Sequence, residues 1–214
     1  MTADHIPPAD QPRAEARRAQ ILEAAVACFR AHGFHGASIA QISKTAGMSA
    51  GHIYHYFENK EAIIAAIVER DLERLLTLSA EMRSARDVLE AMIERAAEGV
   101  RDNLDPESAG LKLEIVAEAS RNPRMAEIVR NADKLCAASL AETLRTMRRN
   151  CGHHDDEAEI AGLTEVLAAM FGGLLVRSVR NPGLDQDMVT RMFQRVIRFL
   201  VTETLSPAAE KPVH

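Results

Sequence analysis

The sequence predicts an all-α protein in which a small N-terminal helix-turn-helix domain precedes a larger helical domain. Almost every segment between turn signals carries apolar residues at the three- and four-residue spacing of a helix. No run of five or more residues shows the alternation of a strand rich in Val, Ile and Thr. Turn-forming pairs such as Asp105-Pro106 and Asn122-Pro123 divide the chain into about nine helical segments. These three observations exclude a sheet-based fold.

The first two helices carry clear end signals. The first is expected over residues 13–32, because its apolar side chains share one face and Gly33 supplies a C-cap. Ser38 and Gln41 form the pattern of a capping box, which opens a short second helix. That helix is expected to stop at Gly47.

The remaining helices follow from caps and breaks. Ser49 caps a third helix that ends near Phe57, and Asn59 caps a long fourth helix. Further helices are expected over residues 85–104, 107–121, 124–149, 156–180 and 185–205.

Composition excludes several classes of protein. With 47% hydrophobic and 27% charged residues, the 214-residue chain is not disordered, collagenous or a disulfide scaffold. Its longest apolar runs fall short of the ~20 residues that span a bilayer. The N-terminus has no apolar core of the signal-peptide kind, and three scattered cysteines form no disulfide framework. We therefore expect a soluble cytoplasmic protein with no membrane partner.

Charge is distributed unevenly along the chain. The net charge is −5, which by itself argues against a polyanionic partner. Residues 13–60, however, hold six Arg or Lys against three acidic residues, whereas the rest from Glu61 holds 20 basic against 26 acidic residues. A basic N-terminal part on an acidic body predicts two functions in one chain.

The third helix has the face pattern of a DNA-reading helix. At 100° per residue, Ile53 and Phe57 lie together and are expected to face the core. The rest of its surface carries a glycine, two imidazoles and two phenols: Gly51, His52, Tyr54, His55 and Tyr56. Such outward groups suit a helix laid in a DNA major groove, where they meet base edges and phosphates.

Phosphate contacts are expected around this helix. Ser38 and Ser49 stand at helix N-termini, where backbone amides and the helix dipole favour an anion. Lys60, in the first turn of the fourth helix, is placed to hold another phosphate. A basic arm of Arg13, Arg17 and Arg18 is expected to extend along the backbone or into a minor groove.

The residues of this region closely resemble the DNA-binding domain of the TetR/AcrR family of bacterial one-component regulators. The resemblance covers residues 18–71 and rests on Ile21-Leu22-x-Ala24-Ala25, Phe29, Gly33-Phe34, Ser38-Ile39-x-x-Ile42, Ala46-Gly47-Met48-Ser49 and Gly51-x-x-Tyr54-x-Tyr56-Phe57-x-x-Lys60-Glu61. It implies phosphate contacts from Ser38, Ser49, Tyr54, Tyr56 and Lys60, and base contacts from around Gly51, His52 and His55. One departure is Ala50, where many members carry a longer side chain. Base readout here is expected to depend more on the histidines, on thymine-methyl contact or on DNA shape.

The larger domain is expected to hold a mainly apolar effector pocket. Its candidate lining residues are Met92, Leu111, Glu114, Ile115, Glu118, Met125, Ile128 and Leu135. Glu114 and Glu118 are four residues apart on one helix, and a solvated face is the favoured interpretation. If one of them is buried in the pocket, it would select a cationic ligand.

The last two helices predict a homodimer. Both are rich in small and apolar residues, and family members pair these helices across a two-fold axis. The interface candidates are Leu163, Leu167, Met170, Leu174, Met188, Met192, Phe193 and Val196. An apolar face of this size would be a liability on a monomer.

Other functional classes find less support. The histidine pairs at 32/35 and 52/55 lack a Cys or acidic partner for a metal. The turn with Cys151, His153, His154, Asp155 and Asp156 is a better metal candidate, but a solvated loop whose Asp155 or Asp156 caps the next helix is favoured. Cys28 and Cys136 are expected to be buried, inert thiols. No convergent catalytic set is visible, so neither an enzyme nor a cofactor is expected.

We thus predict a homodimeric transcriptional repressor that binds palindromic operator DNA and is released by a small-molecule effector. The expected organisation is a tail at residues 1–12, a DNA-binding domain at 13–60, an effector and dimerisation domain at 61–206, and a tail at 207–214. The alternatives are a helical protein-interaction module and a regulator that responds to metal or redox state.

Overall fold

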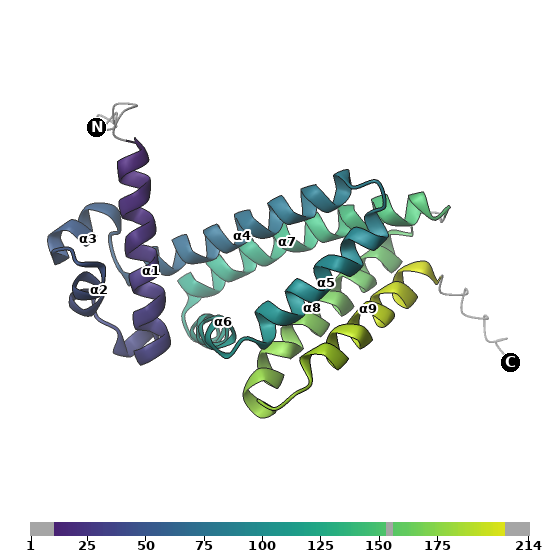
Figure 1. Cartoon of the computed structure of the whole chain (residues 1–214). Coiled ribbons are helices and arrows are strands. Elements are labelled where there is room, and N and C mark those ends of the chain that lie inside the picture. Colours follow the sequence, from purple (N-terminus) through teal and green to yellow (C-terminus); the bar gives the residue numbers. More distant parts are fainter. Residues whose placement is uncertain (1–10, 153–155, 204–214) are drawn as a thin grey trace, which may run out of the picture. The chain divides into compact units, whose positions relative to one another are not determined.

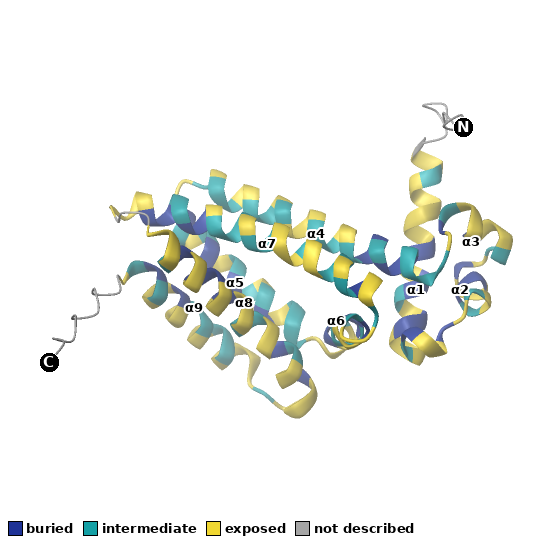
Figure 2. Ribbon diagram, turned by 180° about the vertical axis from the view of Figure 1, so that it is seen from behind, coloured by how far each residue is buried: buried dark blue, intermediate teal, exposed yellow. Residues whose placement is uncertain are grey.

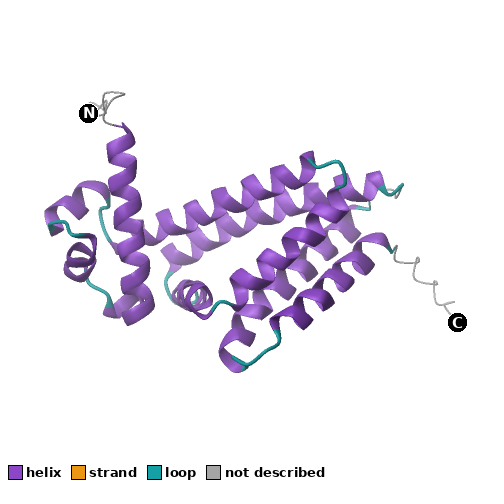
Figure 3. Cartoon of the chain, viewed as in Figure 1, coloured by secondary structure: helices purple, strands orange, loops and turns teal. Residues whose placement is uncertain are grey.

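The computed structural model describes residues 11–152 and 156–203, and all regular structure in these residues is helical (Figure 3). The predicted all-α fold is confirmed. The expected tails up to residue 10 and from residue 207, together with His153, His154 and Asp155, lie outside the described residues.

The described helices follow the predicted order. They are α1 (Gln11–Gly36), α2 (Ile39–Ala46), α3 (Ala50–Tyr56), α4 (Lys60–Ser84), α5 (Val88–Leu104), α6 (Pro106–Ala119), α7 (Pro123–Asn150), α8 (Glu157–Arg180) and α9 (Gln186–Thr202). The helix that was expected from residue 85 begins at Val88, because the Asp87 carboxylate accepts a hydrogen bond from the Glu90 amide and caps it there.

Glycines with positive φ redirect the chain at two helix ends near the N-terminus. Gly33 has φ 67° and ψ 171°, which interrupts α1 at the position predicted for its end. Gly47 has φ 64° and ends α2, and the Met48 amide then donates to the Ser43 carbonyl. Both conformations favour glycine because a Cβ would be strained there.

The described chain forms two compact units. Unit 1 comprises residues 11–71 and Gly110–Arg130, and unit 2 comprises Leu72–Ala109 and residues 131–203. The helices α4, α6 and α7 therefore each contribute residues to both units. This division differs from the single boundary expected after residue 60, because part of α6 and α7 packs with the N-terminal helices.

Each unit has its own hydrophobic core, seen as the dark blue faces of its helices in Figure 2. In unit 1, α1 packs on α2 and α2 packs on α3, with Ile21, Phe29, Ile42, Ile53 and Ile63 fully or almost fully buried. In unit 2, α5 packs against both α8 and α9 (Figure 1). Its core includes Met92, Leu144, Ile160, Leu167 and Ile197.

Candidate nucleic-acid interface

The α2–α3 turn is fixed by backbone contacts. The side-chain amide of Gln20 on α1 donates to the Ala46 carbonyl at 2.8 Å, next to the left-handed Gly47. Ser49 then caps α3 by accepting a hydrogen bond from the His52 amide. Because Ile53 is completely buried, the orientation of this short helix about its axis is set by the core.

The outward face of α3 carries the predicted polar and aromatic groups. Tyr54 is 55% exposed, and His52 and His55 are exposed as well. The rings of His52, His55 and Tyr56 contact one another with centroids 5.2–6.4 Å apart. Tyr56 is only half-buried and also packs on the unit 1 core, so its ring is anchored whereas that of Tyr54 is free.

The first turn of α3 is open on its outer side. Gly51 is exposed, and a Cβ placed there would meet nothing within 4 Å. Ala50 is half-buried and offers only a methyl group. The backbone of this turn can therefore approach another molecule closely.

Ser38 and Ser49 occupy the helix N-caps that the sequence predicted. The Ser38 hydroxyl accepts from the Gln41 amide, and the Gln41 side chain accepts from the Ser38 amide at 2.7 Å, which completes the capping box. Both serines are exposed. Their contacts with phosphate stay a prediction.

Lys60 has intramolecular partners that the sequence did not predict. Its ammonium donates to the carbonyls of Phe34 and Ala37 at 2.7 and 2.8 Å and lies 4.7 Å from the centre of the Phe34 ring. Two of its three donors are thus used within the protein, so a phosphate contact from Lys60 would depend on the third.

The arginines at the N-terminus do not form a flexible arm. Arg13, Arg17 and Arg18 all lie within α1. The guanidinium of Arg18 lies 4.7 Å from the centre of the Phe57 ring, and Arg17 donates to Gln20. The expectation of an extended arm is wrong for these residues, because helix α1 begins before them, at Gln11.

Glu114 and Glu118 hold the last turn of α1, beyond its kink at Gly33. Glu114 Oε1 accepts a hydrogen bond from the Phe34 amide at 2.8 Å, and Glu118 Oε2 accepts from His35 Nε2 at 2.9 Å. Glu118 is 2% exposed and also bonds Arg121 and Asn122. The favoured expectation of a solvated face is therefore wrong for Glu118.

The pKa of Glu118 reflects opposing effects. Burial raises the pKa of this carboxyl, but hydrogen bonds from Asn122, His35 and Arg121 and the charge of His35 outweigh burial and hold it below its ordinary value. Glu118 is consequently an ionised, acceptor-only group in the interior of unit 1.

The eight effector-pocket candidates divide between the two units: six lie in the Gly110–Arg130 part of unit 1, and Met92 and Leu135 lie in unit 2. Met92 lies in the unit 2 core, whereas Leu111, Ile115 and Met125 lie in the unit 1 core, against which Ile128 packs. Leu135 is 53% exposed. These positions were predicted from helical periodicity, which identifies inward faces but not which core a face joins.

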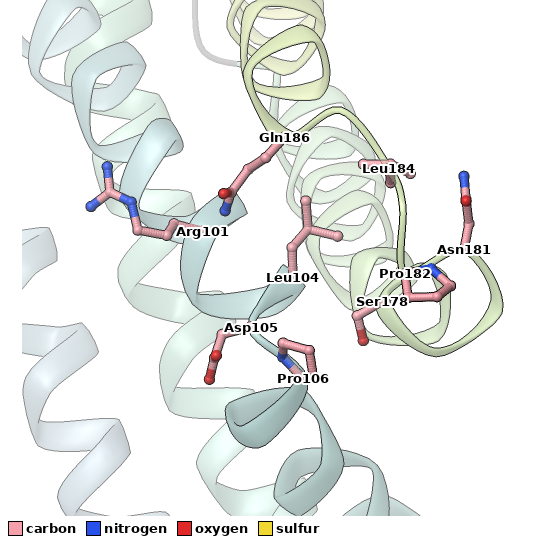
Figure 4. A pocket seen from close by; sticks show the side chains of 9 residues that line it. All are labelled: Arg101, Leu104, Asp105, Pro106, Ser178, Asn181, Pro182, Leu184 and Gln186. Atoms are coloured by element: carbon pink, nitrogen blue, oxygen red, sulfur yellow. The ribbon is translucent and has the colours of Figure 1, made fainter.

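A cavity of about 290 Å³ lies instead within unit 2, where α5 turns into α6 and α8 turns into α9 (Figure 4). Its lining residues are Arg101, Leu104, Asp105, Pro106, Ser178, Asn181, Pro182, Leu184 and Gln186. In Figure 4 the side chain of Gln186 extends toward α5, and the guanidinium of Arg101 points away from the other labelled side chains. The turn pairs Asp105-Pro106 and Asn181-Pro182 were the only sequence signal for this place.

The interface candidates on α8 and α9 divide into two groups. Leu163, Leu167 and Leu174 are buried within the single chain, the first two in the core of unit 2, so their assignment to a subunit interface is wrong. Met170 and Phe193 are half-buried. Met188, Met192 and Val196 are exposed, as are apolar residues that the sequence analysis did not select: Val166, Val176, Val179 and Phe199.

Helix α8 is long and apolar enough to cross a membrane by length and composition, with a mean hydropathy of 1.6 over the tested window. Only 22% of that window is buried within the chain. One such helix is weak evidence for a membrane span, since helices of soluble proteins pass the same test. An exposed apolar face of this kind commonly marks an interaction site.

His153, His154 and Asp155 of the candidate metal turn lie outside the described residues, so a metal site at this turn stays a hypothesis. Among the residues that are described, no group of three or more His, Cys, Asp or Glu side chains is arranged to hold a metal. Asp156 caps α8 by accepting from the Ala158 amide, as predicted for the solvated loop. Cys28 is buried, and burial raises the pKa of the half-buried Cys136 thiol, with the charge of Asp133 adding to the shift.

Comparison with known proteins assigns families to both parts of the chain. Residues 21–67 match the family described as "Bacterial regulatory proteins, tetR family", and residues 85–202 match "BetI-type transcriptional repressor, C-terminal". The transcriptional regulator UidR of Escherichia coli is 32% identical over 168 residues, covering 77% of this chain and 83% of UidR. The regulator BetI of Cronobacter sakazakii is 31% identical, covering 76% and 79% of the two chains. The structure of Salmonella enterica GusR superposes with a TM-score of 0.73 at 31% identity, covering 87% of this chain and 94% of GusR.

Proposed function

The chain belongs to the TetR family of bacterial regulatory proteins and is a DNA-binding transcriptional regulator; on this premise we propose that it is a homodimeric repressor released from a palindromic operator by a small-molecule effector. Its relatives are named as transcriptional regulators, and we propose that this chain likewise acts in the cytoplasm as a regulator and not as an enzyme. The description of the C-terminal family as a transcriptional repressor supports the direction of regulation.

The single observation that carries DNA recognition is the division of α3 into two sides. Ile53 is buried, while His52, Tyr54 and His55 are exposed around the open turn at Gly51. We propose that the imidazoles and the Ala50–Gly51 turn meet base edges and that Ser38, Ser49, Tyr54 and Tyr56 contact phosphates. Lys60 would add a phosphate contact through its remaining donor.

A gel shift with the DNA upstream of the chain's own gene, at two salt concentrations, tests this function. Binding that weakens steeply as salt rises is expected, because each phosphate contact releases condensed counterions. A protein-interaction module, the alternative function, would show no such affinity. A reporter gene behind the same DNA tests repression, since loss of the regulator should raise expression.

The outer faces of α8 and α9 support the homodimer. Exposed Val166, Val176, Met188, Met192 and Val196 would be covered by the same face of a second copy across a two-fold axis. Gly172 and Gly173 are exposed, with open space where a Cβ would lie, which would let the backbones of two α8 helices approach. A monomer mass at micromolar concentration would contradict this proposal.

The effector is proposed to bind in the unit 2 cavity. Its lining combines apolar Leu104, Pro106 and Leu184 with the side-chain amides of Asn181 and Gln186. A volume of about 290 Å³ lies at the small end of ligand pockets, so a small polar ligand is expected. Compounds can be screened for thermal stabilisation, which reaches roughly 2.7 kcal/mol at a hundredfold excess over Kd. Gln186→Leu should abolish the stabilisation.

A further inference from the structure

Residues 33–37, called the elbow here, comprise the last turn of α1 beyond its kink at Gly33 and the residue that follows it. The elbow leads into α2 and so determines the direction in which the chain leaves α1. Gly33 takes φ 67° at the start of the elbow. A Cβ on Gly33 would also lie 3.0 Å from Glu114 Oε1. The close approach of α6 is therefore built into the elbow together with its backbone conformation.

Side chains from two other helices hold the elbow. From α6, Glu114 accepts from the Phe34 amide and Glu118 accepts from the His35 ring. Because a carboxylate only accepts, His35 must carry the proton on Nε2. From α4, Lys60 donates to the carbonyls of Phe34 and Ala37. The elbow is thus bonded through its amide, its carbonyls and its imidazole.

Burying the charged carboxylate of Glu118 costs desolvation free energy that an apolar side chain at this position would not cost. The carboxylate is almost completely buried, and replacing a buried ion pair by apolar residues is often neutral or stabilising. Three groups, from His35, Arg121 and Asn122, converge on its two oxygens. Their geometry fixes where α6 lies against the elbow, which an apolar contact would leave free to slide.

The segment Gly110–Arg130 has a double membership. By sequence it lies inside the C-terminal family match at residues 85–202, whereas by packing it belongs to unit 1 with the reading helices. We propose that Glu114 and Glu118 are positioning residues for DNA binding: through the elbow they fix the direction in which α2 and α3 are presented to DNA. The inference depends on the proposed function only in that DNA affinity is its readout.

The sign of the effect separates this role from simple electrostatics. Both residues are acidic, so removing either charge should strengthen DNA binding if only the long-range field mattered. A positioning role predicts the opposite, because neither side chain needs to touch DNA to lower the affinity. Glu127 is an exposed carboxylate in the same segment and provides the matched control.

The experiment measures the affinity of the full chain for a duplex of its own upstream DNA, by fluorescence anisotropy, in parallel with the melting temperature. Glu114→Ala and Glu118→Ala are each expected to weaken binding about tenfold, whereas Glu127→Ala leaves it unchanged or slightly tighter. Glu114→Gln should restore affinity to within about threefold of wild type, since its amide oxygen still accepts from the Phe34 amide.

A second readout follows the reading helix directly. Both tyrosines of the chain lie on α3 and there is no tryptophan, so intrinsic fluorescence reports on this helix alone. Faster acrylamide quenching is expected in Glu114→Ala and Glu118→Ala, but not in Glu127→Ala. If Glu118→Ala is unfolded at the assay temperature, Glu118→Gln and the Glu114 pair decide the question.

Folded Glu114→Ala and Glu118→Ala variants with wild-type affinity, or with the tighter binding of a simple charge loss, would overturn the positioning role. A wild-type chain without salt-dependent DNA affinity is a different result. It would overturn the proposed function and remove this inference with it.

Discussion

Unit 1 and unit 2 leave different side chains on their surfaces. On α3 of unit 1 the exposed groups are histidines and a tyrosine, and the apolar residues Ile53 and Phe57 are buried. On α8 and α9 of unit 2 the exposed groups include Val166, Val179 and Phe199. The difference agrees with the proposal that α3 of unit 1 meets DNA through polar groups, whereas the exposed apolar face of unit 2 is covered by a second copy of the chain.

The largest effect is expected inside unit 2. Leu167→Ala removes a fully buried side chain and should lower the free energy of unfolding by about 2–5 kcal/mol. Val166→Ala, one residue away but exposed, should cost less than about 1 kcal/mol in the isolated chain. Chemical denaturation at low protein concentration measures both values. Equal losses at the two positions would contradict the assignment of inner and outer faces of α8.

The exposed face of α9 gives the next effect. Met192→Glu places a charge on the surface proposed to pair and should convert the dimer to a monomer, with a loss of operator affinity of about a hundredfold, or roughly 2.7 kcal/mol. Sedimentation velocity measures the mass. Leu75→Glu is the matched control, because Leu75 is also an exposed apolar residue of unit 2 but lies on α4. If Leu75→Glu also dissociates the dimer, the exposed face of α9 is not the specific pairing surface.

The exposed face of α3 provides a third test. His55→Ala should relax base preference and weaken operator binding by about tenfold, within the roughly 1–3 kcal/mol of a specific base contact. Tyr54→Phe should weaken binding to operator and random DNA alike. Anisotropy titrations measure the affinity of each variant, relative to wild type, for the operator duplex and for the random duplex. Identical effects of the two variants on both DNAs would contradict the assigned roles.

Acid should affect unit 1 through Glu118. The pKa of this carboxyl is lower in the folded protein than its ordinary value of 4.5, because hydrogen bonds and the charge of His35 outweigh burial. The associated stability is therefore present above that value and is lost as pH falls through the folded pKa. Glu118→Gln should be less stable near neutral pH and should show a smaller drop in melting temperature from about pH 5 to pH 3.

Glu157→Gln is the control for this acid effect. The pKa of Glu157 is also lowered, by a hydrogen bond and the charge of Arg145, but the side chain is exposed and solvent screens the pair. Its replacement should leave the acid profile nearly unchanged. If the melting temperature of Glu118→Gln falls with pH as steeply as that of the wild type, the buried carboxylate does not make stability depend on pH in this range.

Most helix ends and the buried side of α3 could be predicted from the sequence because local residues determine them. Gly33, Gly47 and Ser49 act within one turn of the helix that each begins or ends. The buried side of α8 could not be predicted in the same way. That helix is apolar on most of its surface, so packing in unit 2, not periodicity, decides that Leu167 is buried and Val166 exposed.

The contacts of the elbow could not be predicted from the sequence either. His35 and Glu118 are 83 residues apart, and Phe34 and Glu114 are 80 apart. A pair of glutamates at helical spacing is typical of a solvated face, and only tertiary packing distinguishes it from a buried one. The same holds for Lys60, whose partners come from the elbow and not from its own helix.

The most direct test of the central claim is the mass of the complex between the full chain and a duplex of its upstream DNA, measured by sedimentation equilibrium at low salt. We predict two chains per operator, held together by unit 2 and reading DNA through two α3 helices, with dissociation of the complex as salt is raised. A single chain per duplex, or no complex at low salt, would contradict it.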